Sequence, residues 1–308
     1  MASADIAAAP VHSGKARVNK HKADWRGWKF MWPFAVVFVF VFIVPIVYAV
    51  YISFFKKQMI GGTKFVGFEN YARLIQDPQF WSSVGRVTIF TVFQVPIMLF
   101  LAAAMALALD SMKLHGTKFF RISTFLPYAV PAVVSTMIWG FVYGAKYGLV
   151  GSLNDFLGTN IDVLNPDVLL ASIANINTWE YAGYNMLIFL AALQAIPHDL
   201  YEAARIDGAG PFRIFWTIVL PLIRPILTTV IVFQTMGTWN DFMTPSVYIS
   251  STNKQTIVLQ VFNAISTFTT NWPLFMTVTT IALIPVFVFF IFCQRWIVAG
   301  LVAGSVKG

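Results

Sequence analysis

The sequence of 308 residues has little cysteine, histidine or charge. A single cysteine, Cys293, excludes a disulfide framework and a cysteine-based zinc cluster, and four scattered histidines offer no metal-ligand spacing. Charged residues make up 11% of the chain, against about 25% in a typical soluble domain, so an ordinary soluble domain is excluded. The 30 phenylalanines and 10 tryptophans exclude intrinsic disorder.

Nucleotide-binding and hydrolytic motifs are absent as well. No Gly-x-x-x-x-Gly-Lys-Ser/Thr phosphate loop occurs, because Ala16 stands after Gly14-Lys15 where a hydroxyl residue is needed. Nor is there a Gly-x-Ser-x-Gly elbow or a His-Glu-x-x-His helix. The sequence therefore predicts no catalytic residue and no metal ligand. It also predicts that the chain is not an enzyme and cannot hydrolyse ATP alone.

Apolar residues make up 58% of the chain, and the mean hydropathy is +0.71. A helix needs about 20 apolar residues to cross the hydrocarbon core of a bilayer. Six runs of this kind predict an all-α integral membrane protein with six transmembrane helices. The first run is too long for the apolar region of a signal peptide, so we interpret it as an uncleaved span. The predicted spans are Met31–Phe55, Val87–Leu109, Ser123–Tyr143, Val168–Leu193, Ile226–Tyr248 and Pro273–Cys293.

The distribution of lysine and arginine predicts the orientation of these spans. Of the 21 basic residues, 14 lie in residues 1–29, in the second and fourth connections and at the C-terminus, and 7 lie in the other connections. The richer side is expected to be cytoplasmic, and six spans then place both termini there. The chain thus divides into a basic cytoplasmic tail, 1–29, and a membrane domain, 30–308. The net charge of +8 fits this topology, and we predict no nucleic-acid partner.

The connection over residues 197–221 predicts a structure of its own on the cytoplasmic side. Asp199 is a plausible N-cap with Glu202 three positions later, as in a capping box. Gly208 and Gly210 are expected to end the short helix, and Pro211 to stop its continuation before a second helix begins near Phe212. The pattern predicts a knuckle that projects into the cytoplasm.

This connection resembles the EAA loop of ABC-importer permeases. The family pattern is Glu-Ala-Ala, three residues, Gly, nine residues and Ile-x-Leu-Pro, and the chain keeps every spacing from Glu202 to Pro221. The resemblance implies a type I ABC importer permease fold in the cytoplasmic membrane of a prokaryote. It also implies that a partner ATPase, which binds ATP and Mg, receives the short helix. The residues implied to couple to that ATPase are Glu202, Ala203, Ala204, Asp207, Gly208 and Ala209.

The likeness extends to the maltose-type carbohydrate permeases. The stretches Phe65–Tyr71 and Leu126–Pro131 look like the MalF-like half of those heterodimers, whereas Gln294–Gly308 looks more like the MalG-like half. We favour the MalF-like half because its features cover more of the chain. The resemblance implies a second permease subunit, two cytoplasmic ATPase subunits and an extracellular solute-binding protein as partners.

Polar side chains interrupt the fourth and fifth spans near their middles. Such residues usually face the bundle interior or a wet cavity. Asn177, Tyr181, Tyr184 and Asn185 follow i, i+4, i+7, i+8 spacing and share a helix face. Gln234, Thr238 and Asp241 follow i, i+4, i+7 in the fifth span. Pro127, Pro131 and Pro285 are expected to produce kinks rather than to contact a ligand.

Amides, carboxylates and aromatic rings in one cavity suit a sugar, whose hydroxyls need hydrogen bonds and whose C–H faces need flat apolar surfaces. The resemblance places the family's sugar site mainly on the helices before and after the EAA loop. The predicted substrate-binding residues are Asn177, Glu180, Tyr181, Tyr184, Asn185, Gln234, Thr238, Trp239, Asn240 and Asp241.

Plainer interpretations of these residues stay open. Asn175 and Gln234 could join helices by hydrogen bonds, and Trp239 could be a packing aromatic. Glu180 and Asp241 could need only solvation, or could mark a cationic substrate. The predicted function is that of a permease subunit of a carbohydrate ABC importer, with an oligosaccharide, delivered by the extracellular solute-binding protein, as the expected substrate. The alternatives are an importer for a polyol, a glycerol phosphate ester or an amino acid, an ATP-independent carrier or channel, and a structural scaffold.

Overall fold

The computed structural model describes residues 27–58, 60–111, 116–263 and 271–305. Most of the predicted tail, 1–29, lies outside the described residues, as do residues 306–308 at the end of the MalG-like segment. The chain divides into two compact units, Met1–Tyr48 and Ala49–Gly308.

The first unit contains a long apolar helix that runs on into the second unit. Its parts are α1 (Trp28–Phe38), a π-helical turn η2 (Val39–Ile43) and α2 (Val44–Ser53). The wider turn lies just before Pro45, whose missing N–H removes one hydrogen bond of the α-helical pattern. The helix Trp28–Ser53 is long and apolar enough to cross a membrane; it begins three residues before the first predicted span, Met31–Phe55, and ends two residues before it does.

A small hairpin opens the second unit and departs from the all-α expectation. It precedes a short helix, in the order β1 (Phe55–Lys57), β2 (Thr63–Phe65) and α3 (Glu69–Ile75). The strands are antiparallel, and the connection contains Gly61 and Gly62 at positive φ, a conformation that glycine adopts without steric cost. Lys56 Nζ lies 2.8 Å from Glu69 Oε1 and thereby ties the hairpin to α3. This lysine lowers the pKa of the Glu69 carboxyl group.

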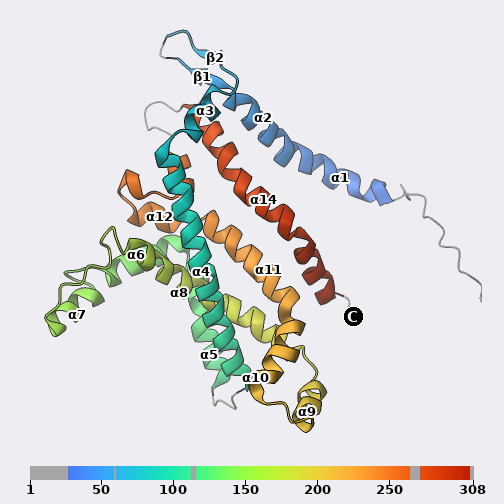
Figure 1. Ribbon diagram of the computed structural model, residues 1–308. Coiled ribbons are helices and arrows are strands. Elements are labelled where there is room, and N and C mark those ends of the chain that lie inside the picture. Colours follow the sequence, from blue (N-terminus) through green and yellow to red (C-terminus); the bar gives the residue numbers. More distant parts are fainter. Residues whose placement is uncertain (1–26, 59, 112–115, 264–270, 306–308) are drawn as a thin grey trace, which may run out of the picture. The chain divides into compact units, whose positions relative to one another are not determined.

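Four long helices form the body of the second unit. They are α4 (Pro78–Ser111), α8 (Leu169–Gln194), α11 (Leu220–Trp239) and α14 (Trp272–Ser305). α8 packs most extensively on α4, and α11 packs against both α4 and α14 (Figure 1). The core between them joins Met98 and Ala102 of α4, Met186 and Phe189 of α8, and Val230 of α11.

Length and composition mark four of the described helices as able to cross a membrane, or five if a bent pair counts as one span. The fourth predicted span is not among them, although α8 matches its bounds within one residue. Polar residues such as Asn177, Glu180 and Asn185 lower its hydropathy, and 14 of its 26 residues are buried in the structure. A helix shielded from lipid by its neighbours can carry polar residues that a lipid-facing helix cannot.

The third predicted span is broken into two helices, and the break lies at Pro131, where a kink was expected. It consists of α5 (Thr117–Phe125), a 3-10 turn η3 (Leu126–Ala129) and α6 (Ala132–Val142). The two arms are bent by 102°. Pro131 causes the break, because a proline pushes the preceding residue out of the helical region, and Val130 is indeed extended at φ −78° and ψ 128°.

The fifth predicted span is also interrupted, and it starts earlier than expected. Its parts are α10 (Pro211–Ile214), a π-helical turn η4 (Phe215–Val219), α11 and α12 (Met243–Tyr248). α11 ends at Trp239, so Asn240 and Asp241 lie in a break between helices. The prediction that Asp241 continues a helical face with Gln234 and Thr238 is therefore wrong.

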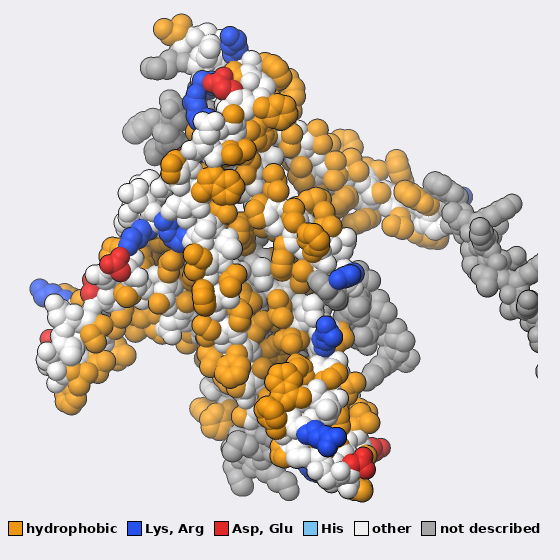
Figure 2. All heavy atoms as spheres, viewed as in Figure 1, with side chains coloured by type: hydrophobic (Ala, Val, Ile, Leu, Met, Phe, Trp, Pro, Cys, Tyr) orange, Lys and Arg blue, Asp and Glu red, His pale blue; other side chains and the backbone are white. Residues whose placement is uncertain are grey.

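Shorter elements complete the fold. They are α7 (Leu149–Leu157), α9 (His198–Ile206), η5 (Thr252–Lys254) and α13 (Ile257–Asn263). The sixth predicted span lies within α14, which continues through Pro285 as one helix. Hydrophobic side chains cover much of the visible surface of the second unit, whereas charged side chains gather near the hairpin, near α7 and near α9 (Figure 2).

Candidate functional site

A polar cavity of about 390 Å³ lies between α8, α11 and the break that follows α11. Its remaining wall comes from η3, α6 and α4, through Tyr128, Ala132 and Met98. Seven of the ten predicted substrate-binding residues line it: Asn177, Tyr181, Tyr184, Gln234, Thr238, Asn240 and Asp241. The structure thus brings residues from two distant segments to one cavity.

Asp241 is held at the cavity wall by groups from two helices. Asn177 Nδ2 of α8 donates a hydrogen bond to Asp241 Oδ2 at 3.3 Å. The backbone N–H of Thr244, in the first turn of α12, donates to Oδ1 at 3.3 Å. The break after Trp239 makes this geometry possible, because it turns the chain so that the carboxylate faces α8.

Three tyrosines form an aromatic wall of the same cavity. The rings of Tyr128 and Tyr184 are stacked, with centroids 4.5 Å apart and planes 15° apart. Tyr181 meets Tyr128 edge to face, with centroids 5.9 Å apart. A stack of this kind presents a flat surface with hydroxyl groups at its edge.

Sequence reasoning missed Tyr128 as a site residue. The signal was available, because Tyr128 lies between Pro127 and Pro131, and interrupted helices at membrane depth are tolerated where they line a cavity or pack against protein. Gly237 was missed too. It lines the cavity, and a Cβ atom added there would meet nothing within 4 Å.

The other three predicted site residues lie elsewhere. Asn185 is fully buried, accepts a hydrogen bond from Gln234 Nε2 at 3.0 Å and donates one to the Tyr181 carbonyl at 3.0 Å. It thereby links α8 to α11. Glu180 is buried in α8 beside the cavity, and its carboxyl group interacts electrostatically with that of Asp241.

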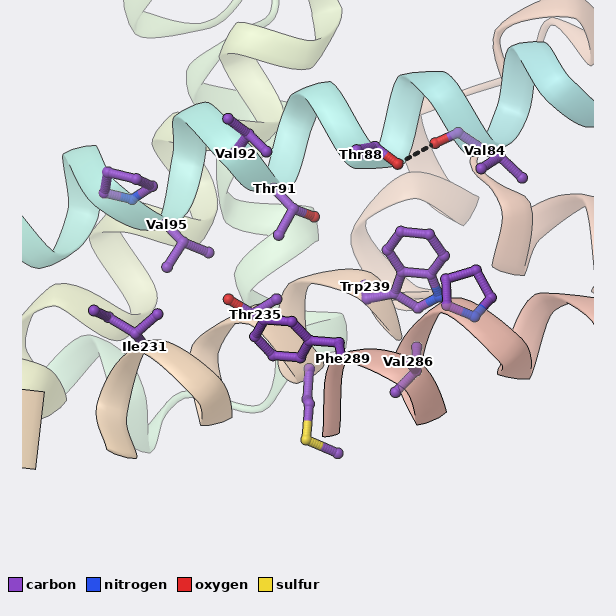
Figure 3. A pocket seen from close by; sticks show the side chains of 13 residues that line it. Val84, Thr88, Thr91, Val92, Val95, Ile231, Thr235, Trp239, Val286 and Phe289 are labelled. Carbon is purple, nitrogen blue, oxygen red and sulfur yellow. Dashed lines mark hydrogen bonds between the residues drawn. The ribbon is translucent and has the colours of Figure 1, made fainter. Parts of the chain in front are cut away.

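Trp239 lines a different cavity, of about 490 Å³, between α4, α11 and α14. Figure 3 shows its indole facing Val84 and Thr88 of α4 across this space. The lining is almost wholly apolar, and none of the described residues that form it is charged. The structure therefore separates Trp239 from the polar residues with which it was grouped.

The polar cavity offers amide, hydroxyl and carboxylate groups together with aromatic rings. No lysine, arginine or histidine is among the described residues that line it. Across the described ranges, no group of three or more histidine, cysteine, aspartate or glutamate residues is placed to hold a metal ion. The chemistry of the cavity suits a hydroxyl-rich ligand without negative charge.

The predicted knuckle is formed by α9 and α10. The helix ends in a Schellman motif: Gly208 has φ +77°, its N–H donates to the Arg205 carbonyl at 3.0 Å, and the Ala209 N–H donates to the Ala204 carbonyl at 2.9 Å. Pro211 is the first residue of α10, so the second helix starts one residue earlier than predicted.

The predicted capping box at the start of α9 is wrong. Pro197 is the N-cap, at φ −58° and ψ 134°, and no side chain caps the helix. Because Pro197 is already extended, the helix begins at once, and Asp199 lies in its first turn rather than before it. A carboxylate in the first turn still interacts favourably with the helix dipole.

The predicted coupling residues divide between two faces of the knuckle. Ala204 and Ala209 pack, with Tyr201, against the core of the second unit. Burial and the nearby charge of Asp110 raise the pKa of Tyr201. The outward face carries the remaining four predicted residues: Glu202, Ala203, Asp207 and Gly208.

Comparisons with known proteins identify related transport permeases. The sulfoquinovosyl glycerol transport system permease protein SmoG of Agrobacterium fabrum is 32% identical over 217 residues, covering 69% of this chain and 70% of that protein. The trehalose/maltose transport system permease protein MalF of Thermococcus litoralis is 32% identical over 226 residues, covering 72% and 76%.

A solved structure shares the fold. A chain of the bacterial alginate ABC transporter, crystallised with an alginate pentasaccharide-bound periplasmic protein, superposes with a TM-score of 0.71. It is 18% identical, and the match covers 88% of this chain and 96% of that one. The model of the family described as binding-protein-dependent transport system inner membrane component matches residues 101–302. The chain is a multi-pass membrane protein that belongs to this family of transport permeases.

Proposed function

We propose that the chain is one of two permease subunits of an ATP-driven importer that moves a carbohydrate, with an oligosaccharide as the expected form, into the cell. The observation that carries the proposal is the Glu202–Gly208 loop. It keeps the family spacing and folds as a short exposed helix closed by a left-handed glycine. Such a helix is a rigid projection to which an ATPase subunit can bind.

The topology belongs to the same proposal. Six spans, with both termini in the cytoplasm, require α8 to serve as the fourth span and the bent α5–α6 segment to serve as the third. Burial of α8 among its neighbours supports this role. The fold shared with the alginate transporter chain supports a type I importer permease.

The polar cavity supports a sugar as the substrate. Asn177, Gln234 and Thr238 supply hydrogen-bonding groups, and Tyr128 and Tyr184 supply a stacked aromatic surface. The name of one relative, a trehalose/maltose permease, favours the same class. The likeness to MalF of Thermococcus litoralis also favours the MalF-like half of the heterodimer.

Movement of the knuckle would connect ATP to transport. An extracellular solute-binding protein delivers the sugar, and two cytoplasmic ATPase subunits bind ATP and Mg and close together. Their closure pulls on α9, which packs on the core through Tyr201, Ala204 and Ala209. The core of α4, α8 and α11 then switches between inward-facing and outward-facing states.

ATP hydrolysis by the assembled transporter tests the proposal. The complex is purified through a tag on this chain and supplied with its binding protein and a panel of sugars. We expect one sugar-loaded binding protein to stimulate hydrolysis, which would also identify the substrate. A complex that hydrolyses ATP but responds to no sugar would overturn the carbohydrate assignment.

Gly208 gives a second test, aimed at the coupling role. Its φ of +77° is strained for any other residue, so Gly208→Val should distort the Schellman turn and lower uptake more than ATP hydrolysis. Gly210 is the matched control, because it is extended at φ −71° and has open space around it. Gly210→Ala should keep both activities, and equal coupling in the two variants would contradict the role of the loop.

An importer of a non-sugar solute is the second candidate. Asp241 at the cavity wall and Glu180 beside it disfavour an anion such as a glycerol phosphate ester, because carboxylates repel it. A polyol would satisfy the same hydroxyl-binding groups. Stimulation by a polyol-loaded binding protein, without stimulation by sugars, would favour this candidate.

A further inference from the structure

The short helix α7 presents its apolar face away from its own loop. Leu149, Leu153 and Phe156 follow i, i+4, i+7 spacing and form a stripe whose side chains are 70%, 51% and 85% exposed. The buried residues of α7 are Gly151 and Asn154, on the other side of the helix. A helix on the surface of a soluble domain shows the opposite arrangement, with its apolar stripe toward the core.

The surrounding loop fixes this orientation. A Cβ atom at Gly148 would lie 2.0 Å from the Phe141 carbonyl oxygen, and one at Gly151 would lie 2.5 Å from that of Ala145, so the turn closes on bare glycine backbone. Asn154 Nδ2 donates to the Ile161 carbonyl at 2.8 Å, and Asn154 Oδ1 accepts the Ile161 N–H at 3.0 Å. The orientation of the stripe is therefore fixed by packing and hydrogen bonds within the loop.

The stripe continues an apolar surface that α6 begins. Met137 and Phe141 of α6 are 69% and 68% exposed. Figure 2 shows hydrophobic side chains along the same edge of the α6 and α7 segments. Because α6 belongs to an apolar segment of a membrane protein, exposed side chains on it have lipid as their natural neighbour.

The groups beside the stripe suit the boundary between lipid and water. Lys146 Nζ lies 5.5 Å from the centroid of the Tyr147 ring, and both residues precede α7. Tyrosine concentrates at membrane interfaces, and lysine is attracted to lipid phosphate groups. Asp155 lies on the side of the helix away from Leu149 and Leu153, where water would remain.

We propose that α7 lies at the interface between lipid and water on the outer face of the cytoplasmic membrane, the side that the proposed topology gives it. Leu149, Leu153 and Phe156 then lie among the lipid acyl chains. The occupant of this apolar face is the lipid bilayer rather than a protein. A helix anchored in this way holds the loop that leads into α8, the helix that carries Asn177, Tyr181 and Tyr184.

Site-directed spin labelling of the intact transporter tests the proposal. The complex is purified through this chain and placed in nanodiscs of phosphatidylethanolamine and phosphatidylglycerol. After Cys293→Ser, single cysteines replace Leu149, Leu153 or Phe156 and carry the label. Asp155→Cys and Asp162→Cys are the controls. Collisions with oxygen, which dissolves in lipid, are compared with collisions with a water-soluble nickel chelate.

Labels on the stripe should collide mainly with oxygen, and labels at the two control positions mainly with nickel. A stripe that collides mainly with nickel, or is shielded from both reagents by a protein, would overturn the proposal. A second measurement needs no substitution: a phospholipid with a photoreactive acyl chain should crosslink to the 149–157 segment of the unmodified complex. Absence of that crosslink, with crosslinks present on α6, would also count against it.

Discussion

The two sides of α11 differ in a way that its sequence conceals. Thr238 and Trp239 are neighbours in the chain, yet Thr238 lines the polar cavity of about 390 Å³ and Trp239 lines the apolar cavity of about 490 Å³. One side meets α8 and the helix break, and the other meets α4 and α14. A run of polar and aromatic residues at the end of a helix is thus divided by the helical turn.

The comparison shows that two polar groups of the cavity reach it only because helices are interrupted. Asp241 faces α8 because α11 stops at Trp239, and Tyr128 reaches the cavity because Pro131 breaks the third span. The apolar side is built from uninterrupted helices. Substitutions on the polar side should therefore change transport, and matched substitutions on the apolar side should change stability or nothing.

The largest effect is expected at Gly237. A leucine there would project into open space in the polar cavity and occupy it, while the helix itself gains from replacement of glycine. We expect uptake in proteoliposomes to fall about tenfold or more, equivalent to at least 1.4 kcal/mol of lost binding. The midpoint of thermal unfolding should not fall.

Thr235→Leu is the matched control for Gly237→Leu. Thr235 is two positions away on α11 and lines the apolar cavity, so the added volume enters a space without substrate. Uptake should stay within about twofold, since the substitution removes no binding group. If both variants lose uptake equally, the two cavities do not differ in function.

Neighbouring substitutions at Thr238 and Trp239 sharpen the comparison. Thr238→Val keeps the shape and removes a hydroxyl at the cavity wall, which should raise the substrate concentration for half-maximal uptake about two- to tenfold, the value of one hydrogen bond. Trp239→Phe should leave that concentration unchanged and lower only the unfolding temperature. A change in that concentration for Trp239→Phe, with none for Thr238→Val, would indicate that Trp239 and not Thr238 contacts the substrate.

Much of this arrangement could be predicted from the sequence, for reasons that the residues make clear. Apolar runs located the long helices, because lipid imposes a minimum length on a helix that crosses it. Their starts were less well predicted, since the helices of the second and fifth predicted spans begin nine and fifteen residues earlier than expected. Polar residues within the fourth and fifth spans located the cavity, because unpaired polar groups are costly there. The knuckle was found from the spacing of Glu202, Gly208 and Pro221.

Other features depend on three-dimensional context. The resemblance placed Trp239 with the cavity residues, but this side chain lies on the other side of α11 and lines the apolar cavity. Periodicity placed Asp241 with them by assuming a helix that continues, whereas Asp241 reaches the cavity from the break after α11. Asn185 shares a helix face with Tyr181, but its side chain is bonded to Gln234 of α11 and does not line the cavity. No local pattern reveals which partner helix satisfies a buried amide.

The hydrogen bond from Gln234 to Asn185 should contribute to stability, in addition to the role of Gln234 at the cavity wall. Gln234→Leu or Asn185→Leu alone leaves a polar group without a partner, and each should lower the free energy of unfolding by about 1–3 kcal/mol. The double variant should cost less than the sum of the two, with a coupling of about 0.6–1.7 kcal/mol. Thermal unfolding of all four proteins measures this cycle, and additive losses would exclude a direct bond.

The smallest effect is expected at Asp167, which lies outside both cavities. Lys254 Nζ lies 2.8 Å from Asp167 Oδ1, and this lysine holds the pKa of the carboxyl group below its usual value of 3.8. A lowered pKa stabilises the fold above pH 3.8, and that contribution is lost only as the pH falls through the lowered value. The pair is exposed, so the Asp167→Asn variant should resemble the parent closely in unfolding temperature and uptake. Any small difference should stay constant from pH 8 to pH 5 and shrink with added salt, because salt screens exposed charges. A difference that grows between pH 8 and pH 5 would mean that another group, and not this carboxylate, responds to pH in that range.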